Sequence, residues 1–437
     1  MAKFSKRVIT GLILVILISS LLLQSTNVKA DWEMFHHDPA HTGVGTGNPV
    51  LTPTLQWTFN VTTNSNITFA SDWSSPAVVN GVVYIGESGY YTYNSSHYVD
   101  LHITLGGFYA LNATSGVILW STLGSNFESS PAVFGGVVYV GCEDGNLYAF
   151  NASDGYKIWN YTTGLEVRSS PAITNGIVYV GSFDNNVYAL NATNGQKIWS
   201  YTTGNSVDSS PAVVNGIVYV VSEDNNVYAL NATNGEKIWS YTTGENIYVS
   251  PTVANGIVYV GSDNSNVYAL NATRGGKLWN YTVGGVLSDP AIANGILYID
   301  ARDSNIYALN ATDGAKFWNY NTTAGLIWSA PVINDGVIYV GSNDETLYDS
   351  NYALNASDGA ELWNYSTIGY IELSPAVVNG VLYFGTFAGQ VYALGVPSSS
   401  PTSSPAVPEF SWLAVIPLLV GMLSIAIVLR HRKTSKA

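Results

Sequence analysis

The chain has 437 residues, one cysteine and a formal net charge of −14 at neutral pH. A single cysteine excludes an intrachain disulfide. Residues 31–409 carry all 30 acidic side chains and only eight basic ones, a net charge of −22, which disfavours a nucleic-acid partner because phosphate contacts need a basic face.

Residues 1–30 have the features of a secretion signal. Lys3, Lys6 and Arg7 form a charged start, residues 9–23 are apolar, and Ala30 offers a small residue at the cleavage point. An uncleaved anchor helix is the alternative, but the apolar run is short for a membrane span. We therefore expect the mature protein to begin near Asp31.

Four residues just after this point raise the question of a metal site, namely His36, His37, Asp38 and His41. The chain holds only six histidines, and no second pair of ligands with suitable spacing accompanies this group. We expect no bound metal here.

Residues 209–244 are the unit from which most of the chain is built. Four short runs rich in Val, Ile, Tyr and Trp suit a pleated, half-buried surface. Asn215-Gly216 separates the first two runs, and Asn-Gly is a strong hairpin signal because both residues tolerate positive φ. The unit is therefore predicted to be a four-stranded antiparallel meander.

This unit occurs eight times, at steps that are mostly 39 or 40 residues. Its proline recurs at Pro76, Pro131, Pro171, Pro211, Pro251, Pro290, Pro331 and Pro375. Its tryptophan recurs at Trp57, Trp120, Trp159, Trp199, Trp239, Trp279, Trp318 and Trp363. The first Trp precedes the first Pro, so we expect residues 54–61 to pair with Val391–Leu394 and close a ring that hides its sheet edges. The sequence predicts an all-β, eight-bladed propeller over residues 31–396.

The stretch from Ala189 to Trp199, ALNATNGQKIW, resembles the tryptophan-docking motif AxDxxTGxxxW of PQQ-like repeat propellers. Asn191 stands where the family usually has Asp, and Asn194 where it has Thr. Seven hairpins show the pattern, and the WxMFxxDxxHTG opening is also common in that family, where it leads the chain into the ring. The resemblance implies that the eight tryptophans are structural and pack between blades. It leaves chemistry open, because the family mixes quinoprotein dehydrogenases with non-enzymatic scaffolds and surface proteins.

The first repeat contains an insertion between Tyr84 and Tyr109 that is rich in Tyr and His. Exposed aromatic loops on a rigid scaffold often bind something. The alternative, which we slightly favour from sequence alone, is a loop folded against its own blade.

The chain ends in a different composition. Residues 397–410 form a Ser/Thr/Pro linker, residues 411–429 are long and apolar enough for one transmembrane helix, and residues 430–437 are a basic tail. The basic tail predicts a cytoplasmic C-terminus and an extracellular propeller. Pro408-Glu409-Phe410 resembles the PEF-type sorting signals of archaeal surface proteins.

Asn-x-Ser/Thr sequons are abundant, and seven of them lie in the docking hairpins. An extracellular chain is expected to carry glycans at some of them. The alternative for the hairpin set is that Asn caps its own turn.

The repeats differ from one another most at the position three residues before each proline. We expect the loops that contain this position to surround the channel mouth. The candidate ligand residues there are Trp73, Glu128, Arg168, Asp208, Tyr248, Trp328 and Glu372. Their charges favour a neutral or cationic ligand over an anion. Drift at an unconstrained rim is the alternative.

Two functions compete at this point. The first is a non-enzymatic surface protein that binds an unknown protein or glycan, or acts as an envelope scaffold, without catalytic residues or a cofactor. The second is a quinoprotein dehydrogenase, for which the resemblance would imply PQQ stacked on a Trp, a Ca²⁺ held by acidic and Asn side chains, and often a vicinal disulfide. Cys142 alone cannot form that disulfide, and we favour the first function.

Overall fold

A computed structural model describes residues 31–45, 47–60, 74–93, 100–104, 106–286, 288–322, 329–342, 348–371 and 373–396. The predicted signal, linker, membrane span and basic tail lie outside these ranges. Within them, no helix is long and apolar enough to cross a membrane.

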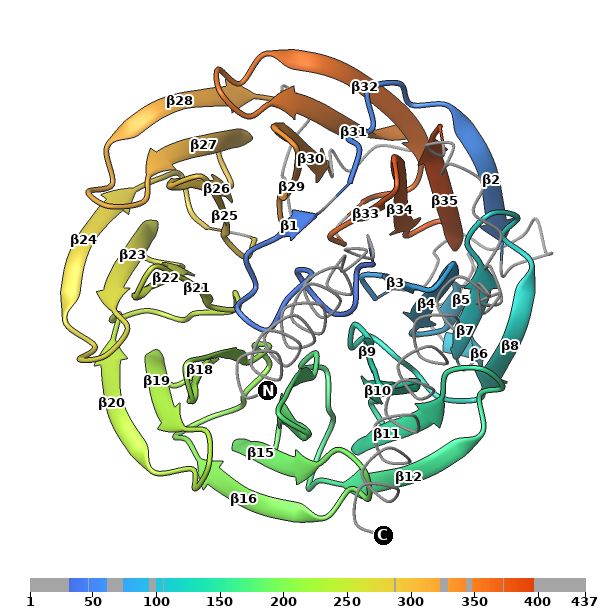
Figure 1. The fold of residues 1–437 in the computed structure, drawn as a ribbon, viewed down its shortest axis with the longest axis horizontal. Coiled ribbons are helices and arrows are strands. Elements are labelled where there is room, and N and C mark those ends of the chain that lie inside the picture. Colours follow the sequence, from blue (N-terminus) through green and yellow to red (C-terminus); the bar gives the residue numbers. More distant parts are fainter. Residues whose placement is uncertain are drawn as a thin grey trace, which may run out of the picture. The chain divides into compact units, whose positions relative to one another are not determined.

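Eight four-stranded antiparallel units form a ring (Figure 1), and we number these blades 1 to 8 in the order of their inner strands. Blade 1 consists of β3 (Ala77–Val79), β4 (Val82–Glu87), β7 (Gly107–Asn112) and β8 (Ile118–Leu123). Blade 2 consists of β9 (Ala132–Phe134), β10 (Val137–Gly141), β11 (Asn146–Asn151) and β12 (Lys157–Thr162). Blade 3 consists of β13 (Ala172–Thr174), β14 (Ile177–Gly181), β15 (Asn186–Asn191) and β16 (Lys197–Thr202). Blades 4 and 5 consist of β17 (Ala212–Val214), β18 (Ile217–Ser222), β19 (Asn226–Asn231) and β20 (Lys237–Thr242); and β21 (Thr252–Ala254), β22 (Ile257–Ser262), β23 (Asn266–Asn271) and β24 (Lys277–Thr282).

The remaining blades continue the same order from the channel outward. Blades 6 and 7 consist of β25 (Ala291–Ala293), β26 (Ile296–Asp300), β27 (Asn305–Asn310) and β28 (Lys316–Asn321); and β29 (Val332–Asn334), β30 (Val337–Gly341), β31 (Tyr348–Asn355) and β32 (Glu361–Ile368). Blade 8 consists of β33 (Ala376–Val378), β34 (Val381–Thr386), β35 (Gln390–Gly395) and, as its outer strand, β2 (Leu55–Asn60). The predicted eight-bladed, all-β propeller is confirmed.

Ring closure follows the predicted pairing. β2 runs antiparallel to β35, with Trp57 opposite Ala393 and Asn60 opposite Gln390. The segment just before β2 also replaces a missing turn, because Val50 O accepts a hydrogen bond from Trp363 Nε1 at 2.9 Å. The beginning of the propeller thus supplies both the last outer strand and the last docking turn.

The local turns form as the residue types require. Asn215 and Gly216 have φ values of 52° and 76°, which allow the tight turn between β17 and β18. In the docking hairpin, Asn231 Oδ1 accepts a hydrogen bond from the amide of Thr233 at 2.8 Å. Asn at this repeat position therefore caps its own turn.

Tryptophan joins each blade to the next. Trp239 Nε1 and Tyr219 Oη of blade 4 both donate to Ala272 O of blade 5, at 2.8 and 3.1 Å. Gly275 lies under the Trp239 ring with positive φ, and a Cβ there would come within 2.6 Å of the indole. The same donation to a main-chain carbonyl occurs for all eight predicted docking tryptophans at 2.8–3.2 Å.

The first described residues run through the central channel (Figure 1). Backbone amides of the inner strands donate to this segment from blade after blade, for example Val133 to Glu33 O at 2.7 Å and Val253 to Ala40 O at 2.9 Å. β1 (Val44–Gly45) then pairs in parallel with β29. Residues 31–45 therefore follow the inner strands through the channel, a path that no repeat in the sequence indicates.

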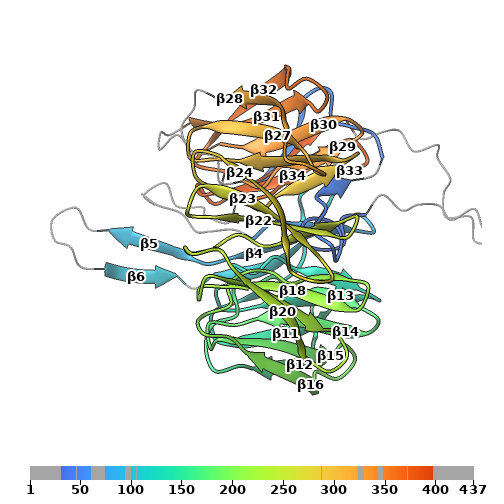
Figure 2. The same ribbon diagram turned by 90° about the vertical axis from the view of Figure 1, so that its left-hand side faces the viewer.

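The insertion in blade 1 forms a two-stranded hairpin of β5 (Tyr90–Tyr93) and β6 (Asp100–Thr104). It projects from the ring in Figure 2, so the expectation that it folds against its own blade is wrong. It occupies the loop between the second and third strands of its blade, and this loop lies at the channel mouth in the other blades.

Candidate ligand site at the channel mouth

Four of the seven predicted rim residues are described, and they occupy equivalent positions in successive connecting loops. These are Glu128, Arg168, Asp208 and Tyr248, whereas Trp73, Trp328 and Glu372 lie outside the described residues. The first two meet directly, with Arg168 Nη1 3.2 Å from Glu128 Oε2. Tyr248 is half exposed, and its hydroxyl accepts a hydrogen bond from Asn246 Nδ2 at 2.7 Å.

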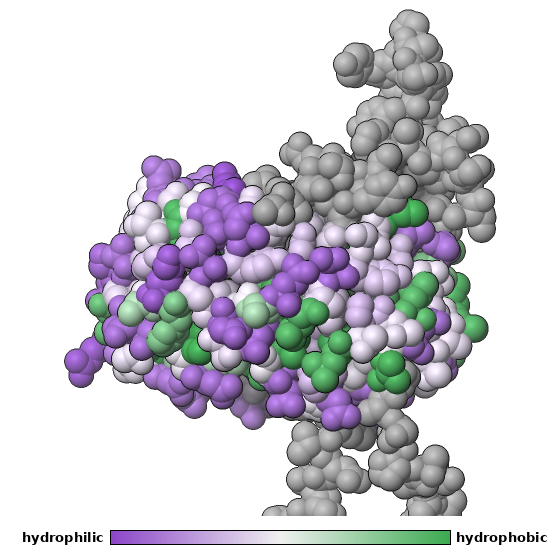
Figure 3. Space-filling view, turned by 90° about the horizontal axis from the view of Figure 1, so that it is seen from above, coloured by the Kyte–Doolittle hydropathy of each residue, from purple (hydrophilic) through white to green (hydrophobic). Residues whose placement is uncertain are grey.

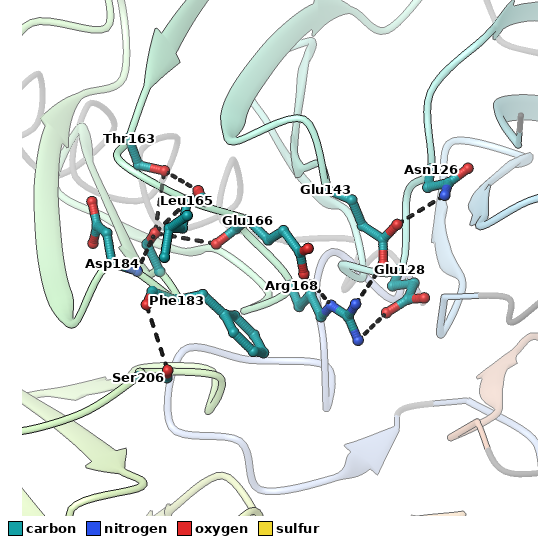
Figure 4. Close-up of polar contacts among 11 residues, drawn as sticks. Asn126, Glu128, Glu143, Thr163, Leu165, Glu166, Arg168, Phe183, Asp184 and Ser206 are labelled. Carbon is teal, nitrogen blue, oxygen red and sulfur yellow. Dashed lines mark hydrogen bonds and ion pairs between the residues drawn. The ribbon is translucent and has the colours of Figure 1, made fainter.

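Arg168 is the centre of an acidic cluster (Figure 4). Its guanidinium also lies 2.8 Å from Glu143 Oε1 and 2.9 Å from Glu166 Oε2, and its charge stands over the Phe183 ring at 5.3 Å. Burial disfavours the charge, but the surrounding carboxylates outweigh it and raise the pKa of Arg168. The single positive charge of Arg168 therefore neutralises only part of the negative charge of the three carboxylates, and the cluster keeps a net negative charge.

A second ring of mouth residues comes from the loops between the second and third strands. Each loop is tied to the neighbouring connecting loop through its backbone, as in Glu143 N to Asn126 O at 3.1 Å and Glu223 N to Ser206 O at 3.0 Å. The variable side chains at this position include Glu143, Phe183, Glu223, Asp263, Arg302 and Phe387. We did not single them out from the sequence, although they diverge within the repeat as much as the predicted rim residues do.

Asp208 and Asp289 belong to the same connecting loops, and each is only partly exposed. Burial raises the pKa of Asp208 to about 6; Arg168 opposes this shift, and Glu223 and Glu166 add to it. Burial raises the pKa of Asp289 to about 7, against hydrogen bonds from Ser250 and with a contribution from Asp208. Both carboxyl groups therefore gain charge as the pH rises through the neutral range.

Asp289 replaces a serine that joins neighbouring blades around the channel. The amide of one blade's serine donates to the hydroxyl of the next, as in Ser130 N to Ser170 Oγ and Ser210 N to Ser250 Oγ, both at 3.0 Å. In blade 6 the acceptor is the Asp289 carboxylate, which receives the Ser250 amide. The substitution of Asp in a repeated Ser-Pro step was the sequence signal for this residue, and our rim prediction missed it.

The histidines of the channel segment lie beneath this mouth. His41 Nδ1 is 3.2 Å from Pro251 O, and His36 Nε2 is 3.4 Å from Ser374 Oγ. Burial is the largest cause that lowers the pKa of His36 to about 3 and that of His41 to about 4. Asp38 binds the amides of Ala40 and Thr42. Among the described residues, no group of three His, Cys, Asp or Glu side chains has a metal-binding arrangement.

Comparison with known proteins places this architecture in a family. The sequence model described as outer membrane protein assembly factor BamB matches residues 162–250 and 245–405, which is more than half of the chain. The chain belongs to this family of PQQ-like repeat propellers. No curated protein sequence matches the chain significantly.

Solved structures agree on the fold. BamB from Moraxella catarrhalis has a TM-score of 0.60 and 18% identity, over 79% of this chain and 100% of that chain. The quinohemoprotein alcohol dehydrogenase from Comamonas testosteroni has a TM-score of 0.68 and 14% identity, over 85% of this chain and 81% of that chain. A europium-containing methanol dehydrogenase has a TM-score of 0.69 and 12% identity, over 86% of this chain and 100% of that chain. Identities this low support the propeller fold alone.

Proposed function

We propose that the protein is a non-enzymatic binding or scaffold protein of the cell surface, whose partner docks at the acidic channel mouth. The observation that carries this proposal is the mouth itself. Glu128, Glu143 and Glu166 converge there around Arg168, at the mouth of a channel through which residues 31–45 run. The variable loops form this end of the ring, and loops on a rigid scaffold commonly carry binding function.

The partner has cationic or neutral polar groups in this proposal. The cluster around Arg168 has three carboxylates against one guanidinium, and Asp208 and Asp289 add negative charge above their raised pKa values. Negative potential at the end of a closed ring attracts cations and repels anions. The aromatic hairpin β5–β6, which stands at the same end of blade 1, supports a protein or glycan partner.

The quinoprotein alternative fits the described mouth residues poorly. The carboxylates best placed to hold Ca²⁺ are already paired with Arg168, and the pKa values of Asp208 and Asp289 are raised, which weakens them as ligands near neutral pH. Cys142 is buried and single, so it supplies no vicinal disulfide. We derive no reaction from PQQ or Ca²⁺ in this protein.

We also propose that the propeller is extracellular and is anchored through residues 411–429. The secretion signal at residues 1–30 and the basic residues 430–437 support this topology. In an archaeal host, Pro408-Glu409-Phe410 would direct sorting at the end of the linker.

A titration separates the two functions. The purified full chain in detergent is titrated with PQQ and Ca²⁺ together, and separately with a lysine oligomer, by calorimetry. We expect saturable binding of the lysine oligomer and no heat from PQQ with Ca²⁺. Stoichiometric PQQ binding that depends on Ca²⁺ would favour the dehydrogenase.

A further inference from the structure

The outer strands of the blades differ in charge at one repeat position. In six blades this strand begins with a charged residue, namely Lys157, Lys197, Lys237, Lys277, Lys316 or Glu361. In the two adjacent blades 8 and 1 the first residues are Leu55 and Ile118. Charged residues on exposed edge strands prevent unwanted contacts, so blades 8 and 1 lack this protection.

The turns that lead into these two strands are also uncharged. No Asp, Glu, Lys or Arg occurs between Asn48 and Asn60, or between Asn112 and Phe127. The two stretches touch, because Trp57 Nε1 donates to Ala113 O at 2.9 Å and Gly116 packs against the Trp57 ring. They form one continuous uncharged part of the outer wall.

Apolar side chains are exposed there. We define the apolar wall sector by six of them, each between 45% and 65% exposed: Leu51, Leu55, Val117, Ile118, Leu119 and Val396. Figure 3 shows one side of the outer wall, on which apolar groups lie among hydrophilic ones. An apolar patch without interspersed charge marks a contact surface.

The chain leaves the propeller inside this sector. Val396 is the last described residue, and the amide before it, of Gly395, donates to Thr54 O at 2.7 Å in blade 8. The linker 397–410 then precedes the apolar stretch 411–429. A linker of this length spans at most about 50 Å when fully extended, so the exit point of an anchored propeller stays within that distance of the bilayer.

Charge favours the same orientation. Residues 31–409 have a net charge of −22, and the carboxylates around Arg168 keep the channel mouth negative, so an anionic bilayer surface repels the mouth. The sector carries no charge, and its aliphatic side chains gain free energy when they enter the headgroup boundary.

We propose that the apolar wall sector of blades 8 and 1 is a membrane-contact surface, on which the propeller lies against the bilayer that anchors it. This proposal rests on the anchoring proposed above. It orients the ring with its wall toward the lipid, so the channel mouth opens sideways and stays accessible to a partner.

Single thiol labels test the orientation. In a Cys142→Ser background, Leu119→Cys places a fluorophore in the sector, and Leu278→Cys places it at the same repeat position of blade 5. The two wild-type side chains are 51% and 50% exposed, so the pair is matched. The full chain is reconstituted in anionic vesicles that contain brominated acyl chains, and flotation and quenching are measured. We expect the label at 119 to lose most of its emission and the label at 278 to keep it.

Each other outcome has a separate meaning. Failure of the full chain to float with the vesicles would overturn the anchoring and this proposal together. Flotation with equal quenching at both positions would overturn the orientation alone. A doubled mass in detergent, with the label at 119 shielded there, would assign the sector to a second copy of the chain and contradict the proposal.

Discussion

Trp199 illustrates how one residue type holds the ring together. Its side chain is 7% exposed, and its indole donates to Ala232 O of the next blade at 2.9 Å. We expect Trp199→Ala to lower the free energy of unfolding by about 3–5 kcal/mol, because it empties a large buried site. Chemical denaturation measures this. The neighbouring exposed Ile198→Ala is the control and should change stability by less than about 0.5 kcal/mol; equal effects would contradict the docking role.

Asp300 is a buried acid that the proposed site does not use. It is fully buried at the end of β26, and burial raises its pKa well above the ordinary value. Other blades have Gly or Val at this position, as in Gly261 and Val221. Ionisation is therefore easier in the unfolded chain, and the folded state loses stability as the pH rises above the unfolded pKa of about 4.

The isosteric variant Asp300→Asn cannot ionise and should remove this loss. We expect its stability to match that of the wild type near the unfolded pKa and to exceed it increasingly at higher pH. The difference grows by at most about 1.4 kcal/mol per pH unit until the folded carboxyl ionises. Melting temperatures across this pH range measure it, and a constant difference between the two proteins would contradict a raised pKa.

Residue roles were predictable from the sequence where the repeat enforces them. The docking tryptophans and the capping asparagines recur, so their common role could be inferred from spacing. Glu143 and Asp289 were missed because their importance comes from single substitutions, which matter only once the fold brings them beside Arg168 and Asp208. A repeat pattern locates a variable position but does not show which neighbours it meets.

Among the elements, β2 has the largest consequence for the fold. It pairs with β35 and so closes the last blade, and removing it leaves β35 and the neighbouring blade 1 without a covering strand. We expect deletion of residues 31–60 to abolish cooperative unfolding and to cause aggregation. Deletion of residues 31–45 alone is the control, because it removes the channel segment but keeps β2; it should leave a weaker, still cooperative ring. Calorimetry distinguishes them, and two identical traces would argue against closure by β2.

The elements themselves were largely predictable. Asn-Gly turns and alternating apolar runs placed the strands, and the offset between the Pro and Trp series predicted the closure. The resemblance of the WxMFxxDxxHTG opening implied that residues 31–45 lead into the ring, but their path from blade to blade was not predictable, because backbone hydrogen bonds fix it. The β5–β6 hairpin was misjudged because an aromatic loop carries no signal for whether it packs or projects.

At the scale of the whole molecule, the proposed topology predicts how the protein responds to protease on intact cells. The linker 397–410 lacks the composition to build a core, whereas the closed ring resists cleavage. We expect added protease to release a folded propeller that ends within residues 397–408, identified by mass spectrometry. Disrupted cells are the control for total protein, and a propeller protected until lysis would reverse the orientation.

The most direct test of the central claim, that the acidic mouth is the binding surface, is the affinity of a lysine oligomer for mouth variants at two pH values. Asp208 and Asp289 gain charge as the pH rises from about 5 to about 8, so binding should tighten over that range. Arg168→Gln, which frees three carboxylates, should tighten it further, and Asp208→Asn should weaken it. Lys197→Gln, which removes one positive charge from the outer wall, should leave the affinity for the lysine oligomer unchanged. An affinity that is independent of pH and equal in all these variants would contradict the account.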